Sequence, residues 1–142
     1  MGRVFFDTRK NVHSLGADYQ ALASDSGKIF FINVASGMTL TLPSVADAQE
    51  GWNCEVVIET NVSSNTFTIT EKATADTNVI VLQTVEQDVT GSAAPAGTST
   101  GCTNVILANA ADTIGDSFEI VCSGSKFFVK ANVKADAAVT AS

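Results

Sequence analysis

The chain has 142 residues, enough for one domain whose hydrophobic core needs no metal or disulfide to hold it together. Its net charge is −7, and its 8 lysines and arginines are scattered, so it has no basic surface for binding nucleic acid. Hydrophobic residues make up 45% of the chain and charged residues only 16%. Threonine, serine and asparagine fill the difference, which is typical of a sheet-rich protein.

The sequence contains no apolar run near the roughly 20 residues that span a bilayer, so no membrane segment is expected. The stretch from Met1 to Asp7 meets a charge before a long apolar run develops, unlike a secretory signal. We therefore expect the chain to be made and folded in a cytoplasm.

Residues 1–23 differ from the rest because they show no strand or helix period beyond a weak helical pattern over 17–23. The apolar segment Val4-Phe5-Phe6 precedes a polar stretch that carries Arg9 and Lys10. This composition predicts an extended N-terminal arm that orders against a neighbour. The two Phe side chains either pack on their own domain or anchor on another protein, as aromatic hot spots do.

From residue 24 onward, short apolar or alternating segments are separated by turn residues. Ser44 to Gly51 predicts one short helical turn, and the Ser123-Gly124-Ser125 segment predicts a tight hairpin turn. The alternating segment 66–70 is predicted to be the hairpin partner of 52–59. The predicted strands are 29–32, 38–42, 52–59, 66–70, 78–85, 102–108, 117–122 and 126–131.

The chain has no long amphipathic helix between these strands, which argues against parallel βαβ units. The pattern predicts an all-β fold: an antiparallel β-sandwich, jelly-roll-like, or a small barrel. The predicted organisation is an N-terminal arm (1–23), a β-domain (24–133) with a flexible loop (90–101), and a fraying C-terminal tail (134–142). The predicted core consists of Phe30, Ile32, Leu40, Leu42, Val56, Ile58, Phe67, Ile69, Ile80, Phe118, Ile120 and Phe128.

No residue combination in the sequence predicts catalysis. His13 is the only histidine, and no G-x-S-x-G segment supports a Ser-His-Asp triad. Glu55 and Glu59 alternate with the apolar face of their strand, so they are expected to face solvent rather than act as an acid–base pair. Asp112 and Asp116 flank a turn but lack the dense Asp/Asn spacing of a calcium loop.

The three cysteines, Cys54, Cys102 and Cys122, form no CxxC pair, and with one histidine they lack the ligand spacing of a zinc site. They are predicted to be small apolar fillers on strands. A cytoplasmic origin argues against a disulfide. The sequence therefore predicts no catalytic residue, no cofactor and no metal.

Two groups of motifs stand out in the chain. The first runs from Asp25-Ser26-Gly27-Lys28-Ile29-Phe30 through Thr39-Leu40-Thr41-Leu42-Pro43 and on to Thr68-Ile69-Thr70. The second is Gly115-Asp116-Ser117-Phe118-Glu119-Ile120, followed by Gly124-Ser125-Lys126-Phe127-Phe128-Val129. Together they resemble a β-module frequent in tailed-bacteriophage structural proteins. Such modules occur in capsid decoration (cement) proteins and in tail-fibre or tail-associated proteins.

The chain is short and acidic and contains no shaft-like repeat, and in this it is similar to capsid decoration proteins. The resemblance implies a non-enzymatic homotrimer on the outer surface of the virion capsid, bound to the lattice of the major capsid protein and stabilising the head. Val4, Phe5 and Phe6 would be apolar anchors, and Arg9 and Lys10 would steer the arm toward acidic groups. The alternative is a tail-fibre or tail-associated receptor- or carbohydrate-binding module, in which Trp52 and Tyr19 stack on sugar rings.

Overall fold

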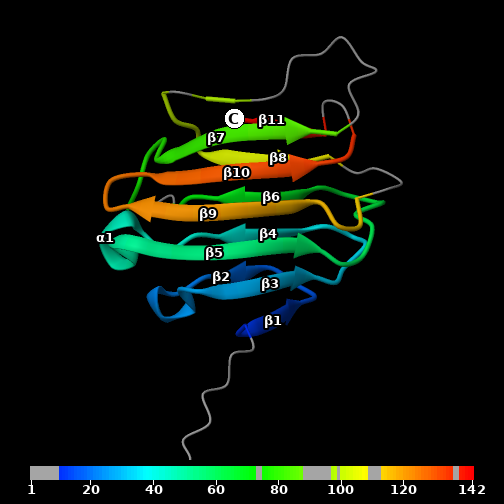
Figure 1. Cartoon of the computed structure of the whole chain (residues 1–142), viewed down its shortest axis with the longest axis horizontal. Helices are drawn as coiled ribbons and strands as arrows, with labels where there is room; N and C mark the ends of the chain where they lie inside the picture. The colour runs from blue at the N-terminus through cyan, green and yellow to red at the C-terminus, as the bar shows by residue number, and fades with distance from the viewer. Residues whose placement is uncertain (1–9, 73–74, 88–96, 99, 109–112, 136–137) are drawn as a thin grey trace, which may run out of the picture.

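The chain folds into two β-sheets that pack face to face (Figure 1). The computed structural model describes residues 10–72, 75–87, 97–98, 100–108, 113–135 and 138–142. The six-stranded sheet has the order β1-β3-β5-β9-β10-β7, and the five-stranded sheet has the order β11-β8-β6-β4-β2. Each sheet ends in two edge strands, so the fold is an open sandwich and not a closed barrel. The all-β sandwich prediction is confirmed.

The six-stranded sheet consists of β1 (Val12–Leu15), β3 (Lys28–Ile32), β5 (Glu50–Ile58), β7 (Ile80–Glu86), β9 (Ser117–Ser123) and β10 (Phe127–Val133). The five-stranded sheet consists of β2 (Tyr19–Gln20), β4 (Met38–Thr41), β6 (Phe67–Thr70), β8 (Asn104–Leu107) and β11 (Val139–Ala141). Helical structure in the described residues is limited to α1 (Val45–Ala48) and a 3-10 turn over Ala23–Asp25.

The sheets are mixed, which corrects the expectation of a purely antiparallel sandwich. From β1 to β6 the chain alternates between the two sheets, so β1, β3 and β5 are parallel neighbours in one sheet, and β2, β4 and β6 in the other. A parallel pair requires a crossover connection, which in most proteins is a helix. Here the crossover is a strand of the opposite sheet, so parallel pairing forms without long helices.

The same alternation corrects the predicted hairpin. Segment β6 does not pair with β5; it lies between β4 and β8 in the five-stranded sheet. The true hairpin joins β9 and β10, which pair antiparallel across the turn at Ser123–Ser125, as predicted. The second half of the molecule is thus largely antiparallel, apart from the parallel pair of β10 with β7.

Residues 12–23 belong to the sandwich, so the predicted arm is too long. Strand β1 pairs with β3 and β2 pairs with β4, and both Leu15 and Ala21 are buried. The helix weakly predicted over 17–23 does not form, because Tyr19–Gln20 is extended and is followed by a 3-10 turn. Whether residues 1–9 form an arm lies outside the described residues.

The predicted fraying tail is also wrong where the structure describes it. Strand β11 pairs antiparallel with β8, and Ala138 and Val139 are buried. The carbonyl of Ser142 accepts hydrogen bonds from the Thr103 and Asn104 amides. Of the predicted loop 90–101, most residues lie outside the described part of the chain. Gly97 pairs with Gln83 of β7.

The core lies between the two sheets and matches the predicted set except at one position. Eleven of the twelve predicted core residues are buried, whereas Phe128 is 51% exposed and Phe127 is fully buried in its place. Phe127 packs edge-on against Trp52, with ring centroids 5.8 Å apart. The two adjacent Phe residues point to opposite faces of β10, and the register with β9 sends Phe127 inward.

The helical turn forms as the sequence predicts. Ser44 caps α1 by accepting a hydrogen bond from the Asp47 amide, and its hydroxyl donates to the Asp47 carboxylate at 2.7 Å. The turn ends earlier than expected, because Gln49 rather than Gly51 is the C-cap and adopts a positive φ of 62°.

Candidate functional site

The two outer faces of the sandwich differ in chemistry. The outer face of the five-stranded sheet carries Thr39 and Thr41 of β4 beside Thr68 and Thr70 of β6, a polar surface suited to water. The outer face of the six-stranded sheet instead carries exposed apolar side chains. Contiguous apolar patches on a soluble protein mark interaction sites, so we take this face as the candidate site.

An apolar row crosses three neighbouring strands of this face. Phe128 of β10 is in register with Val121 of β9 on one side and with Val81 of β7 on the other. Phe128 is 51% exposed and Val121 49%. The three side chains line a depression of about 290 Å³ together with Gln83, Glu119 and Lys130. We call Val81, Phe128 and Val121 the apolar row.

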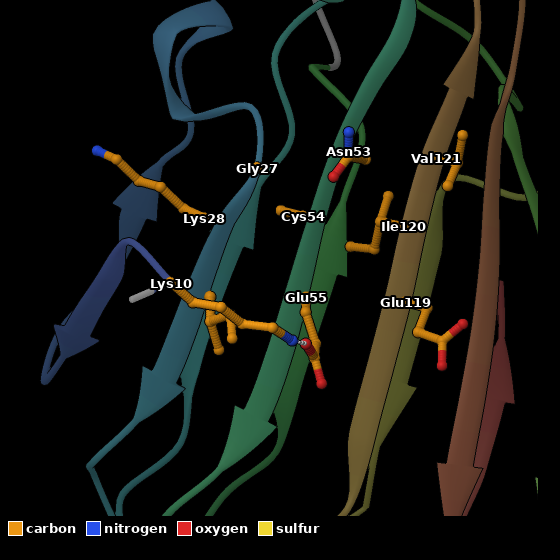
Figure 2. Close-up of a pocket in the computed structure, with 10 residues that line it drawn as sticks. Lys10, Gly27, Lys28, Asn53, Cys54, Glu55, Glu119, Ile120 and Val121 are labelled. Carbon is orange, nitrogen blue, oxygen red and sulfur yellow. Dashed lines mark hydrogen bonds and ion pairs between the residues drawn. The ribbon is translucent and has the colours of Figure 1, made fainter. Parts of the chain in front are cut away.

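A mostly charged row runs beside the apolar row and is displaced from it by two residues in each strand. In register across β5, β9, β10 and β7 lie Glu55, Glu119, Lys130 and Gln83. The Glu55 end of this row borders a second depression of about 340 Å³ between β3, β5 and β9 (Figure 2). There the Lys10 side chain extends to Glu55, with its Nζ 3.4 Å from Oε2, while Glu119 projects from β9 (Figure 2).

The face as a whole offers apolar contact area beside balanced charges. Lys10 and Lys130 offset Glu55 and Glu119, although the whole chain carries −7. Lys10 and Glu55 are both substantially exposed, so their ion pair contributes little to stability and leaves both groups accessible. Apolar area bordered by accessible charges is what a protein–protein contact requires.

Of the predicted partner-binding residues, the structure describes only Lys10. It lies just before β1, at the rim of the larger depression. Val4, Phe5, Phe6 and Arg9 lie outside the described residues. The structure therefore places one predicted contact residue on the same face as the apolar row.

A separate buried cluster joins Asp25, Tyr19 and Lys28. The Asp25 carboxylate is 2% exposed and accepts hydrogen bonds from Lys28 Nζ at 2.6 Å, the Leu22 amide at 2.8 Å and the Tyr19 hydroxyl at 3.0 Å. Burial alone would raise the pKa of this carboxyl, but the hydrogen bonds from Lys28, Leu22 and Tyr19 outweigh burial and hold the pKa below its ordinary value. The hydrogen bond to Asp25 also raises the pKa of Lys28.

The bonds from Tyr19 and Lys28 tie the β2–β3 connection to its flanking strands, and the Leu22 amide bonds to Asp25 within the connection itself. Burial and the bond to Asp25 raise the pKa of Tyr19, so its phenol stays protonated and keeps donating. The three groups thus form a closed, satisfied network, which fits a structural role.

Two other buried carboxylates also hold backbone segments. Glu71 accepts the Asn78 and Val79 amides at 3.1 and 2.9 Å, and Asp116 accepts the Lys134 amide at 3.1 Å. Both lie where the chain passes between strands and needs acceptors for its free amides. Asp112, which with Asp116 was the candidate pair for calcium, lies outside the described residues.

The aromatic residues considered for sugar stacking do not form a platform. Trp52 is 2% exposed and donates its indole N–H to the Leu22 carbonyl, so it presents no ring face. Tyr19 is partly buried against His13 and Phe30, with ring centroids 5.1 and 5.6 Å away. His13 is therefore packed among aromatic rings in β1 and not in an irregular segment.

The cysteines fill the core, as predicted. Cys54, Cys102 and Cys122 are all buried and unpaired. Burial raises the pKa of the Cys54 thiol far above its ordinary value, which keeps it protonated. Within the described ranges, no group of three or more His, Cys, Asp or Glu side chains is placed to hold a metal ion.

Comparison with protein-family models, curated proteins and solved structures finds no match to this chain. In the part of the chain that the structure describes, no helix has the length and apolarity to cross a bilayer.

The sequence does contain a signal for the apolar row, although the prediction of core residues did not use it. Both Ile120-Val121 and Phe127-Phe128 are adjacent apolar pairs, and in a strand adjacent residues face opposite sides. One member of each pair fills the core, so the other must lie on the outer face. The register that aligns Val121 with Phe128 is visible only in the structure.

Proposed function

We propose that the chain is a non-enzymatic structural protein of a tailed-phage virion that decorates the capsid and binds the outer surface of the major capsid protein lattice. The observation that carries this proposal is the pair of motif groups, 25–70 and 115–129, which resembles the β-module of such virion proteins. These segments supply β3–β6, β9 and the first three residues of β10.

The mechanism would be selective binding to the assembled lattice. A protein that binds the mature shell more tightly than its dissociated subunits stabilises the shell by mass action. Many copies on one particle add modest contacts into a large total effect. The predicted anchors Val4, Phe5 and Phe6 would gain free energy if the capsid covered them, because burial of apolar side chains is favourable.

The alternative is a tail-associated module that binds a receptor or carbohydrate. The burial of Trp52 removes the main aromatic candidate for sugar stacking and so favours the head over a carbohydrate-binding role. The resemblance also implies a homotrimer, which would require each copy to present two different surfaces to its neighbours.

Sedimentation tests the proposal directly. Virions that contain the chain would be separated into heads and tails, and each fraction would be probed with an antibody against the chain. We expect the protein in the head fraction in many copies, and we expect heads stripped of it to lose DNA at a lower temperature than heads to which the purified chain is added back. Recovery with tails, or no change in head stability, would contradict the decoration role.

A further inference from the structure

We propose that two copies of this chain pack through the outer faces of their six-stranded sheets, related by a two-fold axis parallel to the strands and lying between β9 and β10. This inference rests on the chemistry and register of that face and not on the proposed phage function. It would give a dimer rather than the trimer that the resemblance implies.

The argument begins with the contrast between the outer faces. Four of the six exposed large hydrophobic residues among the described residues lie on the six-stranded sheet: Val12, Val85, Val121 and Phe128. The five-stranded sheet carries threonines at the equivalent outward positions of β4 and β6. One face is thus suited to water and the other to an apolar partner.

The register makes this face complementary to itself. Val121 of β9 lies opposite Phe128 of β10, and two residues along Glu119 lies opposite Lys130. A two-fold axis between the two strands places β9 of one copy against β10 of the other. Val121 then meets Phe128 of the second copy, and Glu119 meets Lys130 of the second copy, each contact occurring twice.

The strands next to β9 and β10 also bring complementary residues together. By the same symmetry, β5 of one copy faces β7 of the other, because they are the neighbours of β9 and β10. Glu55 then faces Gln83, whose amide can donate to the carboxylate, and Asn53 faces Val81 at the end of the apolar row. Among these facing pairs of described residues, no like charges meet.

Packing of this kind is ordinary for β-sheets. Two sheets stack about 10 Å apart, with strands within about 30° of each other. The axis proposed here keeps the strands of both copies aligned. In the part of the chain that the structure describes, neither Glu119 nor Lys130 forms a salt bridge, so both can pair with a second copy.

Analytical ultracentrifugation of the full chain, with single and mixed charge variants, tests the arrangement. Wild-type protein should form a dimer at micromolar concentration. Glu119→Lys and Lys130→Glu alone should each raise the dimer dissociation constant at least about tenfold, because each reversal creates two repulsive contacts. An equimolar mixture of the two variants should form heterodimers, since every Glu then meets a Lys across the axis.

The mixture separates contact between copies from contact within one copy. Each single variant also places like charges at the in-register positions 119 and 130 of its own sheet, and mixing cannot relieve that, so only pairing between copies rescues association. Phe128→Asp should abolish the dimer, whereas Ile114→Asp, at a 49% exposed apolar residue outside the strands of the sheet, should leave it intact. Circular dichroism of each variant would verify the fold.

The other outcomes overturn the proposal. A monomer at millimolar concentration, a trimer, or a dimer that tolerates Phe128→Asp would show that this face does not pair with itself. Loss of head binding by Phe128→Asp in a protein that is monomeric throughout would assign the face to a capsid protein instead.

Discussion

Asp25 shows how one buried charge fixes the path of the chain at the edge of the sandwich. Its carboxylate holds Lys28 on β3, Tyr19 on β2 and the Leu22 amide between them. The Leu22 carbonyl in turn accepts the Trp52 indole, which ties this connection to the core. An unpaired charge buried at this depth would strongly destabilise the fold. Loss of one partner is therefore expected to weaken the whole network.

Asp25→Asn should therefore lower the free energy of unfolding by about 2 kcal/mol at neutral pH, because three hydrogen bonds lose their charged acceptor. Urea denaturation would measure the loss. Glu59→Gln, at an exposed carboxylate, is the matched control and should change stability by no more than about 0.5 kcal/mol. Equal effects of the two substitutions would show that the cluster contributes nothing.

The same carboxyl predicts a pH dependence of stability. Its pKa in the folded protein lies below the ordinary value of 3.8, so the ionised form is favoured by folding. Its contribution is present in full above that ordinary value and is lost as the pH falls through the lower, folded-state pKa. The difference in stability between wild type and Asp25→Asn should therefore shrink below about pH 4.

At the scale of the element, β11 contributes more to the stability of the fold than its length of three residues suggests. Val139 is buried at 1% exposure, and β11 pairs antiparallel with β8 on the side opposite β6. Val139→Asp should lower the free energy of unfolding by about 3–5 kcal/mol, because it buries an unpaired charge. Thr140→Asp, one residue along and facing outward, should cost far less. Thermal unfolding of both would show whether β11 is docked, and a similar small effect of the two would mean a loose tail.

The central strands could be predicted from the sequence because one face of each is buried. In β5 and β9, buried and exposed residues alternate, and alternation of apolar residues is the sequence signature of such a strand. Their core residues, including Val56, Ile58 and Phe118, follow from this pattern alone.

The terminal strands could not be predicted, because their stability comes from their neighbours. β1 buries only Leu15 of its four residues, and β2 has only two residues, so neither carries a period. The assignment of each strand to one of the two sheets could not be predicted either. Alternation indicates which side chains face inward but not which sheet contains the strand. The parallel neighbours β3 and β5 are brought together by β4 in the other sheet, a relationship that depends on the whole path of the chain.

The candidate site combines residues that no local pattern joins. Glu119 and Lys130 are cross-strand partners because the turn at Ser123–Ser125 sets the hairpin register, and that pair could be anticipated from the sequence. The alignment of Val81 with Phe128 could not, because β7 and β10 are parallel and distant in sequence. Lys10 was predicted as a contact residue from its charge, yet its pairing with Glu55 depends on where β1 docks.

At the scale of the whole molecule, charge is distributed unevenly. The chain carries −7, but on the outer face of the six-stranded sheet Lys10 and Lys130 offset Glu55 and Glu119 beside the apolar row. A net negative charge elsewhere keeps the molecules apart in solution, whereas a neutral, partly apolar face allows one defined contact. The face and the segment 1–9 would therefore serve different partners: a second copy for the face, and the capsid for the N-terminal residues.

Deletion of residues 1–9 tests that division. The truncation spares Lys10 and its pair with Glu55, so the unfolding temperature and the dimer should be unchanged. Binding to heads should be lost, because burying Phe5 and Phe6 on the capsid would supply on the order of 3–6 kcal/mol per copy before ordering costs. Co-sedimentation with heads would measure this, with Arg9→Ala as a milder variant that slows association more than it weakens binding. A truncated chain that binds heads as well as the full chain would leave Val4, Phe5 and Phe6 without a role as anchors and would move the capsid contact onto the sandwich itself.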